Sequence, residues 1–236
     1  MQWQFFVDVP FQYRKIGISY HLLDGTPYTP SYAGLHHRNE HLYGIGDPTL
    51  EVRYFDSLQN WTFGSAIGTS IPLGRIEEDP YLKAALGEVH QHFQMGTGTF
   101  IPSIAGIVMY QKDKNGFLTT LKRDISLYEN RLYYRSGSAQ TWNIGMWHRF
   151  HPKYISLVQL QGRHEQIDTW RDLPAPFSGR DAISCVWSHA FKIRKKQELL
   201  LRLERLIFVH NRGDTQVQDG EGFPLYTTYS LGYSFF

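Results

Sequence analysis

The last twelve residues of the chain, 225–236, form a two-faced pattern that few folds can accommodate. An extended conformation places the large side chains on one face: Leu225, Tyr229, Leu231, Tyr233 and Phe235. The other face carries small side chains: Ser230, Gly232 and Ser234. In a water-soluble sheet such a terminal strand is an apolar edge that favours aggregation. In a transmembrane barrel the large side chains face lipid and the small ones face the lumen, so the pattern predicts a closing barrel strand.

The composition agrees with this fold class. A chain of 236 residues fits one all-β domain, and no run of 18 apolar residues offers a helical membrane span. Aromatic residues make up 15% of the chain, an excess that aromatic belts at the two membrane interfaces would explain. The net charge of +2 gives no signal for nucleic-acid binding. The single cysteine, Cys185, excludes an internal disulfide.

Ten segments are expected to be strands, each of about 9–14 residues, a length that suits a tilted membrane crossing. They are 2–15, 47–56, 60–72, 98–111, 117–127, 139–150, 154–164, 183–193, 198–209 and 225–236. Residues 117–127 and 154–164 alternate poorly, so the sequence leaves the facing of their side chains open. The clearest alternation predicts that these side chains point outward: Trp3, Phe5, Val7, Leu50, Val52, Tyr54, Trp61, Leu231 and Tyr233.

Long and short connections alternate between these segments. Short turns are expected at 56–59, 112–116, 151–153 and 195–197, a medium loop at 128–138, and long loops at 17–46, 73–97, 165–182 and 210–224. A soluble sandwich or lipocalin-like barrel also has alternating strands, but it has no reason to keep this order of connections. We therefore predict one domain over 1–236, an antiparallel up-and-down transmembrane β-barrel with about ten strands in this chain.

Three segments also carry a resemblance to a known family: 44–54 (GIGDPTLEVRY), 65–74 (SAIGTSIPLG) and 94–106 (QMGTGTFIPSIAG). In this order the chain resembles, over about residues 7–111, the outer-membrane barrels of the phenol-degradation meta-pathway family, which are transporter-like. Pro48 and Ile101 depart from that pattern. The resemblance implies a bacterial outer-membrane location and a passive channel for small apolar or aromatic solutes.

The resemblance further implies a hairpin ahead of residues 2–15, and thus about twelve strands in the intact protein. Met1 leads directly into Gln2 and Trp3 without the basic and apolar regions of a signal peptide, although a barrel needs export. We therefore expect a truncation at the amino-terminal side. The expected partners are outer-membrane lipids, lipopolysaccharide and, through the terminal strand, the barrel-assembly machinery. The outward phase of that strand ends at Phe235 rather than Phe236.

Charged residues of both signs fall on predicted inward positions: Asp8, Arg14, Glu51, Arg53, Lys192, Arg194, Arg202 and Glu204. A barrel of ten to twelve strands has a narrow lumen, and these residues are our candidates for its lining. They could flank a solute path, or they could pair with one another and close the lumen. The sequence leaves open a passive channel and a non-transporting structural or surface-interaction barrel.

Catalytic and metal-binding patterns are weak. Histidines cluster in two predicted loops (His36, His37, His41, His90 and His92), but no cysteine or carboxylate pattern completes a metal site. Ser188 and His189 are adjacent on a strand and therefore point to opposite faces, while His148 has no identifiable serine or acid partner. An outer-membrane hydrolase is the weaker alternative. We predict no enzyme, no catalytic residues, no metal or cofactor, and no nucleic-acid partner.

Overall fold

The computed structural model describes residues 1–17, 19–29, 39–91, 93–176, 178–194, 197–212 and 227–235, without the side chains of 14, 16, 211 and 228–235. One sheet dominates it. Its strands, in spatial order, are β1 (Gln2–Asp8), β4 (Thr49–Leu58), β5 (Trp61–Ser70), β6 (Ile101–Lys112), β7 (Asn115–Asp124), β9 (Ala139–His151), β10 (Tyr154–Glu165), β13 (Arg180–Arg194), β14 (Gln197–Asn211) and β15 (Thr227–Phe235). All neighbours are antiparallel, which confirms the predicted all-β, up-and-down arrangement.

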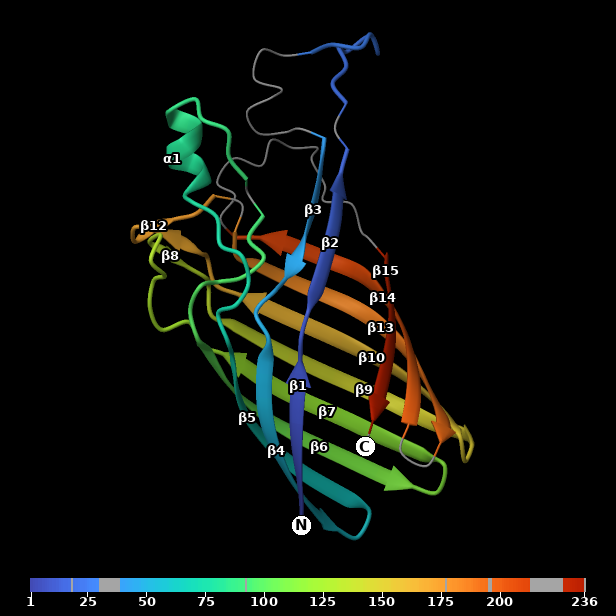
Figure 1. Ribbon diagram of the computed structural model, residues 1–236. Coiled ribbons are helices and arrows are strands. Elements are labelled where there is room, and N and C mark those ends of the chain that lie inside the picture. The colour runs from blue at the N-terminus through green and yellow to red at the C-terminus, as the bar shows by residue number, and fades with distance from the viewer. Residues whose placement is uncertain are drawn as a thin grey trace.

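The sheet curls strongly, and the N- and C-terminal ends lie at the same end of it (Figure 1). The short connections 59–60, 113–114 and 152–153 lie at that end, and the long connections lie at the other. Strands β1 and β15 stand at the two ends of the strand order. No ladder between them occurs in the part of the chain that the structure describes, and the expected truncation stays a prediction.

The first expected strand, 2–15, is in fact two strands, which corrects that prediction. Strand β1 ends at Asp8, opposite Thr49 of β4, and β2 (Phe11–Ile16) pairs instead with β3 (Glu40–Ile45) in a separate two-stranded ribbon. Pro10 lies at the break, where its ring nitrogen cannot donate to a ladder. The expected loop 17–46 therefore contains a strand at its end.

The other long connections also contain structure that the sequence did not reveal. Residues 73–97 include α1 (Pro80–Ala85), whose first turn is capped by the Asp79 carboxylate. Strands β8 (Tyr134–Arg135), β11 (Thr169–Trp170) and β12 (Leu173–Pro174) form a small three-stranded sheet. Among the described helical residues, no segment has the length and apolar character needed to cross a membrane.

The outer, convex face of the curled sheet is apolar. Five of the predicted outward side chains are exposed there: Trp3, Phe5, Val7, Leu50 and Trp61. Val52 and Tyr54 are half-buried, since the Tyr54 ring packs 4.9 Å from the ring of Trp3. The ladder of β14 and β15 places Leu231 opposite Leu201 and Tyr233 opposite Leu199, but their side chains lie outside the described residues.

Register also decides the facing of the two ambiguous segments. Asp124 of β7 lies opposite Ala139, which is 1% exposed, and the Asn143 amide donates to the Thr120 hydroxyl at 2.8 Å. Even-numbered residues of β7 therefore share the inner face. By the same ladders, odd-numbered residues of β10 from Leu157 to Glu165 lie on the inner face.

One carboxylate joins three of the segments that carry the family-like motifs. Asp47 follows β3, and its carboxylate accepts hydrogen bonds from the Gly74 N–H at 2.8 Å, the Thr97 N–H at 2.6 Å and the Thr97 hydroxyl at 2.9 Å. Gly74 and Gly96 pack backbone to backbone beside it, so that a Cβ on Gly96 would lie 2.7 Å from the Gly74 Cα. These glycines therefore permit a close approach that the carboxylate holds together.

Replacing this carboxylate should loosen the long connections. In Asp47→Asn, the amide group would direct N–H donors at the N–H of Gly74 or Thr97. We expect a loss of about 2 kcal/mol in the free energy of unfolding, because a partly buried donor is left without an acceptor. The midpoint of urea unfolding measures it. Asp113→Asn, an exposed turn residue with φ of 53° that asparagine tolerates, is the control, and equal midpoints for both variants would contradict the assignment.

Candidate functional site

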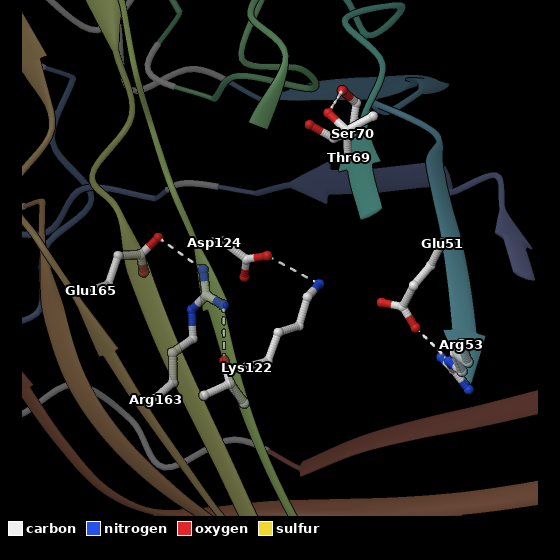
Figure 2. Close-up of polar contacts among 9 residues, drawn as sticks. Glu51, Arg53, Thr69, Ser70, Lys122, Asp124, Arg163 and Glu165 are labelled. Carbon is white, nitrogen blue, oxygen red and sulfur yellow. Dashed lines mark hydrogen bonds and ion pairs between the residues drawn. The ribbon is translucent and has the colours of Figure 1, made fainter. Parts of the chain in front are cut away.

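Opposite charges two residues apart recur on the inner face of the sheet. Residues at this spacing in a strand point the same way, so each pair forms within one strand. The ion pairs are Arg53 with Glu51, Lys122 with Asp124 at 3.0 Å, Arg163 with Glu165 at 3.2 Å, and Arg202 with Glu204 at 2.8 Å. Figure 2 shows the first three, which project from different strands into the curl of the sheet. We call these eight residues the charged belt.

Within the charged belt, the acids and the bases differ in exposure. The four carboxylates are 8% to 23% exposed, whereas the four cations are 31% to 39% exposed. Carboxylates therefore lie closer to the wall, and ammonium and guanidinium groups face the water inside the curl. Because the four cations and three of the carboxylates keep contact with water, those pairs contribute little to stability.

Small residues on β13 allow one arginine to reach across that strand. The Arg202 guanidinium on β14 donates to the Gln161 side-chain oxygen on β10 at 3.0 Å. Between them lie the inner positions of β13, which are Ser184, Val186 and Ser188 and are all less than 9% exposed. Larger side chains at these positions would occupy the space of the arginine. Contacts with Gln161 and Glu204 thus hold the Arg202 guanidinium against the inner wall of the sheet.

A cavity of about 300 Å³ opens on this part of the inner face. Its lining residues come from β10, β13 and β14: Gln161, Arg163, Glu165, Arg180, Ala182, Ser184, Glu204 and Leu206. Glu165 is shared by two guanidinium groups, with Arg163 at 3.2 Å from one oxygen and Arg180 at 3.6 Å from the other. The cavity therefore combines charged groups with a partly apolar floor.

Nearer to the short turns, inner positions become apolar. By register and alternation they are Phe55, Ile107, Met109, Leu118, Trp147 and Leu157, all half-buried. We call them the apolar zone. Gly64 faces Phe55 so closely that a Cβ there would overlap the ring, which shows how tightly this wall packs. The inner face thus changes from charged near the long connections to apolar near the short ones.

The candidates from the sequence lie in different places. Glu51, Arg53, Arg202 and Glu204 belong to the charged belt. Asp8 is exposed at the end of the edge strand β1. Lys192 and Arg194 are exposed near the short-turn end of β13. Arg14 lies on β2, outside the ten-stranded sheet, and its side chain is outside the described residues. That these residues line a solute path stays a prediction.

Sequence reasoning missed several residues of this face: Lys122, Asp124, Arg163, Glu165 and Arg180. Lys122, Asp124 and Arg163 lie in the two segments whose alternation is poor, and Glu165 is the first residue of an expected long loop. A signal was nevertheless present, since Lys122 and Asp124 repeat the spacing of Glu51 and Arg53. Arg180 lies in an expected long loop, because β13 begins three residues earlier than its apolar pattern.

Histidines and serines are engaged in structural contacts. The His148 ring shares a hydrogen bond with the Asn115 side chain at 2.7 Å, and the His189 ring shares one with the Tyr154 hydroxyl at 2.8 Å. Ser188 is buried on the opposite face of β13. The described residues contain no group of three or more His, Cys, Asp or Glu that could hold a metal, while His36, His37 and His92 lie outside those residues.

The small sheet near the long connections is organised around a second carboxylate. Tyr134, Trp170 and Ala175 form its core, and Asp168 accepts hydrogen bonds from the Tyr134 hydroxyl at 3.0 Å and the Gly137 N–H at 2.7 Å. Burial raises the pKa of Asp168 above its ordinary value of 3.8 despite these hydrogen bonds. Burial and the Asp168 charge also raise the pKa of the Tyr134 hydroxyl.

Comparison with known proteins identifies the fold. Neither a family model nor a curated protein matches the chain. Among solved structures, the crystal structure of an outer membrane channel from Pseudomonas putida F1 is similar, with a TM-score of 0.63 and 11% sequence identity. The match covers 99% of this chain and 85% of that one. At this identity the similarity shows an outer-membrane channel fold and leaves the resemblance to the phenol-degradation family without support.

The raised pKa of Asp168 predicts how pH affects the small sheet. A raised folded-state pKa means that the folded sheet binds the proton more tightly than the unfolded chain does, so its stability is full below pH 3.8. Stability should fall as pH rises above 3.8 and level off above the folded-state pKa. Amide hydrogen exchange of residues 169–175, corrected for intrinsic rates, should show this dependence, and Asp168→Asn should remove it. The exposed Asp172→Asn should keep it. A dependence that persists in Asp168→Asn would refute this account.

Proposed function

We propose that the protein is a passive channel of the bacterial outer membrane. The observation that carries this proposal is the contrast between the two faces of one curled antiparallel sheet: large apolar side chains are exposed outside, and charged groups contact water inside. A surface of that kind is unfavourable in water and suits a sheet surrounded by lipid. The similarity to a channel fold supports the same function and is in line with a protein that is not an enzyme.

Aromatic clusters on the outer face support a membrane position. Trp61 packs 4.8 Å from Tyr110, and Tyr154 stacks on Phe191 at 4.9 Å, in each case at the short-turn ends of the strands. Such rings favour the boundary between lipid and water. Ile67, Ile104 and Met146 are more than half exposed along the same face. Lipid and lipopolysaccharide would cover this face, and the assembly machinery would read the terminal strand.

The solutes of this channel would be small apolar or aromatic molecules. The apolar zone supports this assignment, because half-buried aromatic and aliphatic side chains would give such solutes a favourable path through the inner face. The narrow bore expected of a barrel of this size would exclude large solutes.

A non-transporting barrel, closed by its own charges, is the competing function. The ion pairs favour the channel because each forms along one strand rather than across the interior. The Arg202–Gln161 hydrogen bond spans a single intervening strand. These contacts hold charges against the wall and leave the space inside the curl to water.

Purified protein should produce discrete conductance steps in planar lipid bilayers and should accelerate swelling of liposomes in small solutes. Ala105→Trp should reduce both, because Ala105 lies on the inner face and a large ring there narrows the path. The neighbouring Gly106→Trp is the matched control, since Gly106 faces outward with open space around it. Absence of conductance in the unmodified protein would favour the structural barrel. Lipid hydrolysis lost on replacing one serine or histidine would instead indicate the enzyme.

A further inference from the structure

The cavity on β10, β13 and β14 is lined by two arginines and two glutamates, and a third arginine, Arg202, contacts two of its lining residues. Three guanidinium groups, those of Arg163, Arg180 and Arg202, surround two carboxylates, Glu165 and Glu204. Glu165 alone serves both Arg163 and Arg180. We call the three arginines the arginine cluster. Within this set the arginines outnumber the glutamates by one, and the Asp168 carboxylate also interacts with Arg180.

Arg180 is the most exposed of the three arginines. The Arg180 side chain is 53% exposed, against 22% for Glu165, and the 3.6 Å contact runs from its Nε atom alone. A guanidinium group carries five N–H donors arranged as a planar fork, and such a fork matches a carboxylate with two parallel hydrogen bonds. Because the Arg180 side chain is half exposed, its fork is accessible to a ligand in the cavity.

The remaining cavity wall suits the apolar part of the same ligand. Ala182 and Leu206 line the cavity together with Ser184, and both Leu206 and Ser184 are nearly buried. A cavity of about 300 Å³ is at the lower end of the size range of small-molecule sites. It therefore accommodates a compact molecule with one charged end, such as a single ring bearing a carboxylate.

The exposed fractions of the other charged-belt side chains also favour the binding of anions. In every pair the cation is more exposed than the carboxylate, so an anion moving past meets positive groups first. Oriented charges of one sign along a narrow path raise the local concentration of ions of the opposite sign. At the arginine cluster, these more exposed positive groups lie beside a cavity.

We propose that the arginine cluster is a binding site for small organic carboxylates and makes the channel select them. This inference rests on the proposed channel function and names its solute class more closely: aromatic or aliphatic molecules with a single carboxylate. The carboxylate binds Arg180 and Arg163, and the apolar part lies against Ala182 and Leu206. Neutral solutes of the same size pass without this interaction.

The test measures the permeability ratio of benzoate to potassium from reversal potentials across planar bilayers, under a gradient of potassium benzoate. The unmodified protein should give a ratio above one. Arg180→Gln and Arg163→Gln should each lower it by roughly threefold, the size of effect that an ion pair open to water produces. Raising the salt from 0.1 M to 1 M should also lower it, since the screening length falls from about 10 Å to about 3 Å.

Arg123→Gln is the matched control. Arg123 lies one residue from the inward Lys122 and therefore on the outer face, so the same change of net charge should leave the benzoate ratio unaltered. Currents with equal ratios in the unmodified protein and in both cluster variants would overturn the carboxylate site while leaving the channel intact. No current from the unmodified protein would overturn the channel itself. A variant that conducts has folded, so loss of folding is separated from loss of selectivity.

Discussion

The alternation of side chains along a β-strand is the constraint on which the rest of this structure depends. Because successive residues point to opposite faces, one curled sheet has an apolar outer surface and an inner surface that carries the charged belt. The same alternation brings residues two apart onto one face, and it thereby makes each ion pair of the charged belt a local contact. Glu51 and Arg53 need no partner from another strand.

Half-buried carboxylates take the place of an apolar core in the long connections. Asp47 joins the connections that contain Gly74 and Thr97, and Asp168 joins the segments that contain Tyr134 and Gly137. A carboxylate that accepts two or three hydrogen bonds can hold several chain segments where few large apolar side chains are available. The only apolar cluster of buried residues identified within the described chain is small, with Tyr134 and Trp170 at its centre.

The inner face has a charged belt and an apolar zone, and this arrangement suits a solute with one apolar part and one charged part. An apolar ring gains from the half-buried walls near Trp147 and Leu157, and a carboxylate gains from the exposed guanidinium groups at Arg163 and Arg180. Contacts open to water are weak, and a passive channel needs weak contacts because a solute must leave as readily as it enters.

The sequence by itself determined the strand order, the alternation of long and short connections and the outward face of strands such as β1 and β5, because these depend on a period of two and on local turn residues. It did not reveal the break at Pro10, since alternation continues across residues 8–11 and only pairing with different partners separates β1 from β2.

It also did not assign Lys122, Arg163 or Arg180 to the inner face. The strands of Lys122 and Arg163 carry apolar residues on both faces, and only their register against the neighbouring strands decides which way each side chain points. Arg180 fell in an expected loop, because β13 begins before its apolar pattern. The arginine cluster likewise depends on the tertiary structure. Strands β10, β13 and β14 lie side by side in the sheet, and this brings Arg180 near Glu165 and Arg202 near Gln161.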